Sequence, residues 1–420
     1  MIHVSFGLYD KTGRYSKFVG TTMLSIFENT TAAVTVHILH DKTLTDENRE
    51  KIFSVAARFG QTVNFYNVEN FSDELEEFTR YVPGVRELRV SVGALYRLLT
   101  PQILSPEIKK LIYLDADIIV NLDLNELWQI DLGGKILAGV PEILTYESAD
   151  KMINTFNLCA YGFVKPEDYF NSGVLLIDLK FLRGEEAAIK RGLLFRSQNT
   201  FAQDYLDQNV LNYCFASRAL KLPTKFNRFA LYARRDKEQP LKKIYHYAGG
   251  NFGYGLTLDM NDALNRLWLK YFAKTPWFDE ETIARLYEGF TQARAELKES
   301  ALNLSAQVSG KTRAFFVTEK YLDTLVENFF VKKDEEIFIV KGNVGIDKMA
   351  DQMSASRGKR IFFFLLPNFP FKNLEAAGFV RGEDFLDGFE FLPTNYEYRF
   401  AKGFEFLAET YNSYPFVAAL

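Results

Sequence analysis

The chain has 420 residues, 47% of them hydrophobic and 25% charged, so it is rich enough in apolar side chains to bury a sizeable core. Its net charge of −4 comes from 50 basic and 54 acidic residues, and because no basic block dominates, we expect no nucleic-acid partner. The cysteines, Cys159 and Cys214, lie far apart without metal-ligand spacing, which implies neither a zinc cluster nor a disulfide framework.

The first residues run directly into a strand pattern, without the charged and apolar regions of a signal peptide. No segment approaches the length of a membrane helix, which needs about 20 consecutive apolar residues. We therefore expect a cytoplasmic enzyme. Peripheral contact with the inner face of the membrane and assembly into a homo-oligomer are open alternatives.

Apolar strand patterns alternate with helical patterns through the first 120 residues. The strands are predicted at His3–Leu8, Val34–His40, Thr62–Val68 and Lys110–Val120, and the helices at Lys17–Glu28, Asp46–Arg58 and Val90–Leu104. Thr45 is placed to cap the second helix. Strands separated by helices indicate an α/β fold with a mostly parallel, doubly wound sheet, in which ligands bind beyond the carboxyl ends of the strands. Two such ends are the loop Gly7–Arg14 and the sequence Asp115-Ala116-Asp117.

The remainder of the chain adds further elements and then a second α/β pattern. They are predicted at Ala138–Val140, Gly173–Leu179, Glu185–Phe195, Gln203–Phe215 and Leu256–Glu299, and, after a linker at Ser305–Lys311, at Arg313–Thr318, Glu336–Lys341, Asp347–Ser356 and Arg360–Pro367. We expect a catalytic domain over residues 1–255, a helical extension over 256–304 and a small Rossmann-like α/β domain over 312–420. The turn Gly342–Gly345 lacks the full glycine fingerprint of a dinucleotide site, which indicates an accessory domain of unknown role.

The helical segment Leu256–Glu299 is amphipathic and carries large aromatic side chains on its apolar side. They are Trp268, Tyr271, Phe272, Trp277 and Phe278. We expect them to form a buried packing face, and contact with a membrane surface is the alternative.

The strongest local signal is the pair of carboxylates Asp115 and Asp117 within an apolar strand pattern, where unpaired carboxylates would be costly. Strand alternation points both side chains the same way, so both can bind one hard cation. Such a cation can bridge two phosphates and neutralise the charge on a leaving diphosphate. The alternative is that the two aspartates cap the next segment or pair with basic neighbours.

His246 stands apart from the other three histidines and precedes a glycine pair that begins at Gly249. Glycines let the backbone approach a phosphate closely. With Asp115 and Asp117, His246 completes an oxygen and nitrogen ligand set, which suits manganese better than calcium. A structural role for a lone histidine is the alternative.

Two polar clusters lie farther along the chain. Asn171 sits where a loop becomes a strand and is placed to hydrogen-bond a sugar hydroxyl, although a simple turn explains it equally well. Asp207 and Gln208 lie among the polar residues that open a helix, and a helix start needs no function to explain it.

Together these segments resemble glycosyltransferase family 8, the retaining enzymes that include bacterial lipopolysaccharide galactosyl- and glucosyltransferases and glycogenin. The resemblance covers roughly residues 1–280 and follows the order of the family's motifs. The motifs are Ser91–Leu98, Ile112–Asp117, Phe170–Leu175, Asp207–Asn209, His246–Gly249 and Lys274–Trp277. Each is weak alone, but in register along the chain they are specific.

The resemblance implies a GT-A-type domain that binds a nucleotide-sugar, with Asp115, Asp117 and His246 holding Mn²⁺ or Mg²⁺ against the donor diphosphate. The residues implied for donor binding are Gly7, Tyr9, Asp10, Arg97, Asp115, Ala116 and Gly249. The residues implied at the reacting sugar are Asn171, Asp207 and Gln208, with Glu142 near the acceptor. Bidentate geometry suits the Arg97 guanidinium to a diphosphate.

The sequence departs from the family in two places. The first loop is longer than the usual paired-aspartate turn, which leaves open the contacts of Tyr9, Asp10 and Tyr15 with the uracil or ribose. The family's lysine after the His-x-x-Gly element is absent, and Lys11 or Arg14 would have to supply that charge.

The resemblance implies a hexosyltransferase that moves a sugar from UDP-glucose or UDP-galactose to a glycan or lipid-linked acceptor, in bacterial cell-surface synthesis such as that of lipopolysaccharide. Because the amide of Gln208 is a poor nucleophile, we favour same-face transfer over a double displacement, for which Asp207 would be the nucleophile. Two other classes remain: a catalytically silent sugar-nucleotide-binding or scaffold protein, and a nucleotidyltransferase, for which the first loop has few glycines and lysines.

Overall fold

The computed structural model contains two compact units, one within residues 1–282 and one within residues 283–404. The predicted boundaries at residues 255 and 304 fall outside the described residues and stay predictions. The structure describes residues 1–13, 15–71, 73, 76, 80–81, 92–144, 152–153, 155–199, 201, 205–236, 238–248, 263–284, 310–322, 325, 335–340, 346–367 and 369–391.

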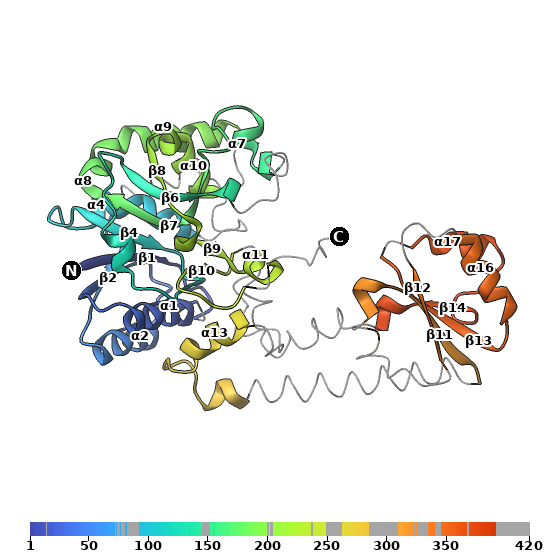
Figure 1. Ribbon diagram of the computed structural model, residues 1–420. Helices are drawn as coiled ribbons and strands as arrows, with labels where there is room; N and C mark the ends of the chain where they lie inside the picture. The colour runs from blue at the N-terminus through green and yellow to red at the C-terminus, as the bar shows by residue number, and fades with distance from the viewer. Residues whose placement is uncertain are drawn as a thin grey trace. The chain divides into compact units, whose positions relative to one another are not determined.

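In the described part of the chain, the first unit is built on a seven-stranded sheet with the order β3-β2-β1-β4-β7-β6-β8 (Figure 1). The strands are β1 (Ile2–Leu8), β2 (Val34–His40), β3 (Thr62–Asn67), β4 (Lys110–Leu114), β6 (Leu137–Pro141), β7 (Phe170–Asp178) and β8 (Ala219–Lys221). β3, β2, β1 and β4 run parallel, whereas β7 is antiparallel to β4 and β6. The α/β class with a mostly parallel sheet is therefore confirmed.

Helices cover both faces of this sheet (Figure 1). One layer holds α1 (Ser16–Asn29), α2 (Asp46–Arg58) and α13 (Ala263–Phe272), and the other holds α8 (Leu179–Leu182), α9 (Glu186–Gln198) and α10 (Leu206–Phe215). Shorter helices are α4 (Thr100–Ile103), α5 (Asn125–Trp128), α7 (Asn157–Ala160) and α11 (Ala230–Arg235). The predicted cap is present, because the Thr45 hydroxyl accepts a hydrogen bond from the backbone N–H of Asn48 at 3.2 Å.

The prediction of one strand from Lys110 to Val120 is wrong. β4 ends at Leu114, and β5 (Ile118–Val120) joins a second sheet with the order β5-β10-β9. In this sheet β10 (Ile244–His246) lies antiparallel to β5 and parallel to β9 (Arg228–Phe229). The crossing is anchored by the Thr22 hydroxyl, which lies 2.8 Å from the carbonyl of Ala116 and 2.7 Å from that of Ile118. Asp115 and Asp117 therefore lie between two sheets, and strand alternation does not explain their common direction.

Two predicted helices also differ from the structure. The segment Val90–Leu104 is a 3₁₀ helix, η2 (Val92–Leu99), followed by α4, and residues 90–91 lie outside the described part. The helix predicted from Gln203 begins at Leu206, after Tyr205, which has a φ of +51°. Apolar periodicity does not detect either feature, because both depend on backbone geometry that tertiary contacts select.

The aromatic side chains predicted to pack are buried. Trp268, Tyr271 and Phe272 of α13 and the following Trp277 are at most 7% exposed, and Phe278 is half-buried. This supports the packing interpretation over membrane contact through these rings. No helix in the described parts of the chain is both long enough and apolar enough to cross a membrane.

Trp277 packs against α1 and is connected to the first loop by hydrogen bonds through Asn48. A Cβ on Gly20 would lie 2.2 Å from the indole ring, so only glycine admits this ring against α1. The indole N–H donates to the side-chain oxygen of Asn48 at 2.8 Å. Asn48 in turn donates to the carboxylate of Asp10 at 3.1 Å and to the carbonyl of Gly13 at 2.7 Å.

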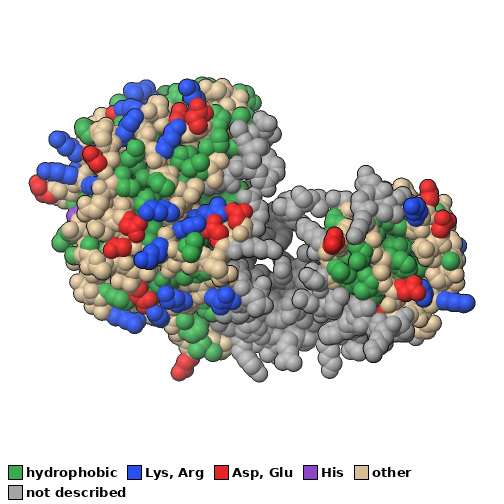
Figure 2. Space-filling view, in the orientation of Figure 1, with side chains coloured by type: hydrophobic (Ala, Val, Ile, Leu, Met, Phe, Trp, Pro, Cys, Tyr) green, Lys and Arg blue, Asp and Glu red, His purple; other side chains and the backbone are tan. Residues whose placement is uncertain are grey.

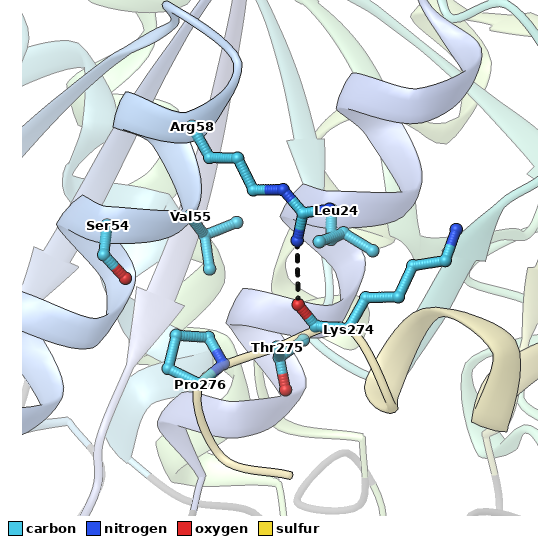
Figure 3. Close-up of a pocket in the computed structure, with 7 residues that line it drawn as sticks. All are labelled: Leu24, Ser54, Val55, Arg58, Lys274, Thr275 and Pro276. Atoms are coloured by element: carbon cyan, nitrogen blue, oxygen red, sulfur yellow. Dashed lines mark hydrogen bonds between the residues drawn. The ribbon is translucent and has the colours of Figure 1, made fainter.

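A hollow of about 220 Å³ lies where this segment crosses α1 and α2 (Figure 3). Its lining residues are Leu24, Ser54, Val55, Arg58, Lys274, Thr275 and Pro276. The Arg58 guanidinium donates to the carbonyl of Lys274 at 3.2 Å. None of the predicted metal ligands lines this hollow, so we attribute it to the packing of the segment.

The second unit is a small parallel sheet with the order β12-β11-β13-β14. Its elements are β11 (Thr312–Thr318), β12 (Glu336–Val340), α16 (Ile346–Ala355), β13 (Arg360–Leu365), α17 (Phe371–Ala376) and β14 (Phe385–Asp387). Consecutive side chains of β13 enter different cores, with Phe362 and Phe364 on one face and Phe363 on the other. The predicted turn Gly342–Gly345 lies outside the described residues.

Basic and acidic side chains are interspersed over the visible face of the first unit (Figure 2). Side chains of both signs therefore occur on the face that is drawn.

The buried His37, which contacts the half-buried His3, predicts how the stability of the first unit depends on pH. His37 Nε2 lies 3.0 Å from His3 Nδ1, and burial, with a smaller contribution from His3, lowers the pKa of His37 to about 4. The ordinary pKa of histidine is 6.5, so between pH 6.5 and a pH of about 4 the unfolded chain binds a proton at His37 that the folded chain does not. The free energy of unfolding should therefore fall by roughly 3 kcal/mol as the pH decreases through this range.

His37→Gln should make this decrease shallower. Denaturant unfolding followed by tryptophan fluorescence measures it, because Trp128, Trp268 and Trp277, the three tryptophans of the chain, all belong to the first unit. Parallel pH curves for the two proteins would contradict the assignment to His37.

Candidate active site

Three predicted metal ligands meet at the junction of the two sheets. Asp115 follows β4, Asp117 precedes β5, and His246 ends β10, paired with Ile118. One ligand atom of each residue lies within 4.8 Å of the other two. His246 Nε2 is 3.3 Å from Asp117 Oδ1 and 3.9 Å from Asp115 Oδ2. Asp117 and His246 are buried, whereas Asp115 is partly exposed and gives access from solvent.

A glycine makes room for this cluster. Gly173 of β7 accepts a hydrogen bond from the backbone N–H of Asp115 at 2.8 Å. A Cβ at Gly173 would lie 2.3 Å from His246 Cε1 and 2.9 Å from Asp115 Oδ2. The space beside the three ligands therefore exists only because residue 173 has no side chain.

The chemistry of the donor set fits a divalent cation. Burial lowers the pKa of His246, but the carboxylates of Asp117 and Asp115 raise it by more, so the net shift is upward. The site thus stabilises positive charge. Two carboxylate oxygens and one imidazole nitrogen are ligands that Mn²⁺ accepts.

Arg97 of η2 ties this cluster to the neighbouring polar residues. Its guanidinium lies 2.6 Å from Asp115 Oδ1, 2.6 Å from the carbonyl of Ser172 and 3.0 Å from Asp207 Oδ2, and it stacks over the ring of Tyr113. Burial lowers the pKa of Arg97, but Asp115 and Asp207 shift it upward overall, so the group stays charged. Arg97 holds both carboxylates in place, and its direct contact with a donor stays a prediction.

Asn171, Asp207 and Gln208 form one buried network. Gln208 Oε1 accepts from the amide of Asn171 at 3.1 Å and from the backbone N–H of Ser172 at 3.0 Å. The Ser172 hydroxyl donates to Asp207 at 3.0 Å, and the Asn171 amide donates to Glu142 at 2.9 Å. The structure therefore brings together residues that the sequence places in three separate segments.

Sequence reasoning missed two members of this network. Asn227, between η7 (Thr224–Phe226) and β9, lies 2.9 Å from His246 Nδ1, and the hydroxyl of Tyr169 lies 3.2 Å from the Gln208 amide. No metal-ligand spacing or glycine pattern distinguishes Asn227. Only the parallel pairing of β9 with β10 brings it beside His246.

In the first loop, Asp10 and Tyr9 both contact other parts of the first unit. The Asp10 carboxylate is buried and accepts hydrogen bonds from Tyr15, Ser16 and Asn48, so it fixes the start of α1. Tyr9 is half-buried against the main core. Contacts of these two residues with a nucleotide stay predictions.

Contacts with the nucleotide-sugar donor are also predicted for Gly7, Ala116 and Gly249. A Cβ on Gly7 would lie 2.3 Å from the carbonyl of Gly93, so this glycine is needed for packing against η2. Ala116 is buried, and its carbonyl accepts from Thr22. Gly249 lies outside the described residues, as does Arg14 among the predicted charge donors.

Comparison with known proteins identifies the chain. Residues 8–251, more than half of its length, match the family model described as Glycosyl transferase family 8. The chain belongs to glycosyl transferase family 8. The predicted family and the prediction of a glycosyltransferase enzyme are therefore confirmed.

The named relatives agree with this family. The chain is 26% identical over 282 residues to a Haemophilus influenzae protein whose name assigns it provisionally to the glycosyltransferases, covering 63% of this chain and 79% of that protein. It is 28% identical over 230 residues to a lipopolysaccharide 1,2-glucosyltransferase of Escherichia coli, covering 54% of this chain and 62% of that protein.

A solved structure shows the same fold. The galactosyltransferase LgtC in complex with donor and acceptor sugar analogues matches 67% of this chain and 98% of its own chain, with a TM-score of 0.50 and 22% identity. The first unit of this glycosyltransferase thus has the GT-A fold.

Substituting Gly173 should weaken binding of a divalent cation. In Gly173→Ala the new methyl group would collide with His246 and Asp115. We expect the affinity for Mn²⁺, measured by isothermal titration calorimetry, to fall roughly tenfold or more. Gly184→Ala is the matched control, because a Cβ at Gly184 meets nothing within 4 Å. Equal Mn²⁺ affinity in the two variants would contradict this account of the site.

Proposed function

We propose that this protein is a retaining hexosyltransferase that moves glucose or galactose from a UDP-sugar to an acceptor hydroxyl, with Mn²⁺ bound by Asp115, Asp117 and His246. The observation that carries the proposal is the convergence of these three side chains within 4.8 Å, at the end of β4, in a chain of glycosyl transferase family 8. The relative named as a lipopolysaccharide 1,2-glucosyltransferase supports a hexose donor and a bacterial cell-surface acceptor, a glycan or a lipid-linked sugar.

The donor would lie over the carboxyl ends of the strands, with its diphosphate against the cluster. A bound divalent cation would offset the negative charge that develops on the leaving UDP. Asp115, held by Arg97, would face the donor because it is the partly exposed member of the three. Tyr9 would contribute to nucleotide binding from the first loop, which Trp277 and Asn48 support.

Same-face transfer agrees with how the polar side chains are held. Both side-chain atoms of Gln208 are engaged, with Asn171 and Ser172 at the oxygen and Tyr169 at the nitrogen. Asp207 is held between Arg97 and Ser172. Neither group is placed as a free nucleophile, which argues against a covalent glycosyl–enzyme intermediate.

The proposed reaction is one coupled exchange at the anomeric carbon. The acceptor oxygen bonds to this carbon on the face from which the diphosphate departs, and the hydroxyl proton moves to the departing diphosphate oxygen. The products are a glycoside of unchanged configuration and UDP. Asn171 and Gln208 would orient the donor sugar, and Glu142, which accepts from Asn171, would lie on the acceptor side.

Removing one carboxylate charge should abolish metal-dependent turnover. We expect Asp117→Asn to lower the release of UDP from UDP-glucose or UDP-galactose in the presence of Mn²⁺ by at least about a hundredfold, because the buried ligand set loses a negative charge. Liquid chromatography measures UDP.

Asp178→Asn is the matched control for Asp117→Asn. Asp178 caps α8 at the other end of β7, and asparagine is an equally good cap. Unchanged turnover in Asp117→Asn would remove the metal assignment. Failure of the wild-type protein to release UDP would favour a silent sugar-nucleotide-binding protein, and release of pyrophosphate would favour a nucleotidyltransferase.

Gln208→Ala separates catalysis from donor binding. We expect kcat to fall by about a hundredfold or more, whereas the Kd for the UDP-sugar changes only a few-fold, because Gln208 positions the reacting sugar and not the nucleotide. Stopped assays give kcat, and calorimetry gives Kd. Mass spectrometry that found a glycosyl adduct on Asp207 would contradict same-face transfer.

A further inference from the structure

Asn227 holds the ring of His246 on the side away from the carboxylates. Its side-chain oxygen lies 2.9 Å from His246 Nδ1, and its side-chain nitrogen lies 2.7 Å from Asn171 Oδ1. All three side chains are buried, with exposures of 1% for Asn227, 3% for His246 and 8% for Asn171. One amide thus bridges the candidate metal ligand and the network around Gln208.

The side-chain orientations of Asn171 and Asn227 are fixed by neighbouring groups that can only donate or only accept a hydrogen bond. The backbone N–H of Gly173 can only donate, and it lies 2.9 Å from Asn171 Oδ1, while the Asn171 nitrogen lies 2.9 Å from the carboxylate of Glu142. Asn171 therefore presents its oxygen to Asn227, so Asn227 donates to Asn171 and presents its own oxygen to His246.

This order determines which ring nitrogen of His246 is free. Because an amide oxygen only accepts, Nδ1 must carry the hydrogen. In the neutral ring, Nε2 then has a lone pair, and this atom is the one that faces Asp117 at 3.3 Å and Asp115 at 3.9 Å. Three electron-pair donors therefore face one another, an arrangement that a cation between them stabilises.

We propose that Asn227 is a positioning residue with two separable tasks: its oxygen fixes the His246 tautomer that leaves Nε2 free for the metal, and its amide nitrogen fixes Asn171, which in turn orients Glu142 and Gln208. This inference rests on the proposed function and assigns it a residue that links metal binding to the reacting sugar. The first task affects metal binding through Nε2 of His246, and the second affects turnover through Gln208.

Two substitutions separate these tasks. Asn227→Leu keeps the size of the side chain and removes both hydrogen bonds. We expect its affinity for Mn²⁺ to fall between about tenfold and a hundredfold. Asn227→Asp keeps the acceptor for Nδ1–H but cannot donate to Asn171. It should bind Mn²⁺ within about threefold of the wild type and still lose about tenfold or more in kcat.

The matched control is Asn265→Leu. Asn265, on α13, is also buried and accepts from Arg234 of α11 at 2.9 Å. It should leave Mn²⁺ affinity unchanged. Calorimetry with Mn²⁺ alone gives the affinities, and thermal unfolding shows that each variant is folded.

The tautomer is measured directly on the wild-type protein, so the inference stays testable even if a variant does not fold. The chain has four histidines, and His246→Gln identifies the signals of His246 in ¹⁵N-histidine spectra. At alkaline pH, without metal, His246 should carry its hydrogen on Nδ1. A hydrogen on Nε2, or wild-type Mn²⁺ affinity in Asn227→Leu, would overturn the inference. Failure of the wild-type protein to bind Mn²⁺ would instead overturn the proposed function.

Discussion

The first unit depends on the close approach of three electron-pair donors at the junction of its two sheets. Asp115 leaves the main sheet, Asp117 enters the small sheet, and β10 returns antiparallel to β5 with His246 opposite Ile118. The two neighbouring carboxylates favour positive charge beside them, and the raised pKa of His246 is one expression of this. Everything around the junction, from the missing side chain at Gly173 to the buried guanidinium of Arg97, agrees with this preference.

Arg97 distributes that positive charge. It pairs with Asp115 on the side of the cluster and with Asp207 on the side of the Gln208 network, where its charge opposes the burial that raises the pKa of Asp207. The polar groups of the Gln208 network are consequently held in fixed positions. Such fixed dipoles stabilise developing charge without reorganisation, which is how preorganised sites lower an activation barrier.

Much of this arrangement could be predicted from the sequence. Apolar periodicity located β1, β2, α1 and α2 to within one residue at either end of each, because these elements bury one face or both against a core. The carboxylate pair at a strand end and the histidine before two glycines singled out Asp115, Asp117 and His246, and the resemblance to the family then implied that they bind one metal ion.

What escaped prediction depends on contacts between distant segments. The break after Leu114 escaped prediction because the apolar pattern resumes at Ile118, so that β4 and β5 look like one strand although they belong to different sheets. The position of Asn227 is set by strand pairing, and its neighbours in sequence give no sign of it. The capping role of Asp10 likewise depends on where α1 begins.

The indole of Trp277 has a consequence for where this enzyme can be cut. The family match ends at residue 251, before the ring that occupies the space above Gly20 and is tied through Asn48 to the first loop. A fragment that ended with the match would retain the candidate metal ligands while leaving a void beside α1 and removing the hydrogen bond from Trp277 to Asn48. A fragment that keeps the packing of the first unit is therefore longer than the segment that matches the family, and it includes this tryptophan.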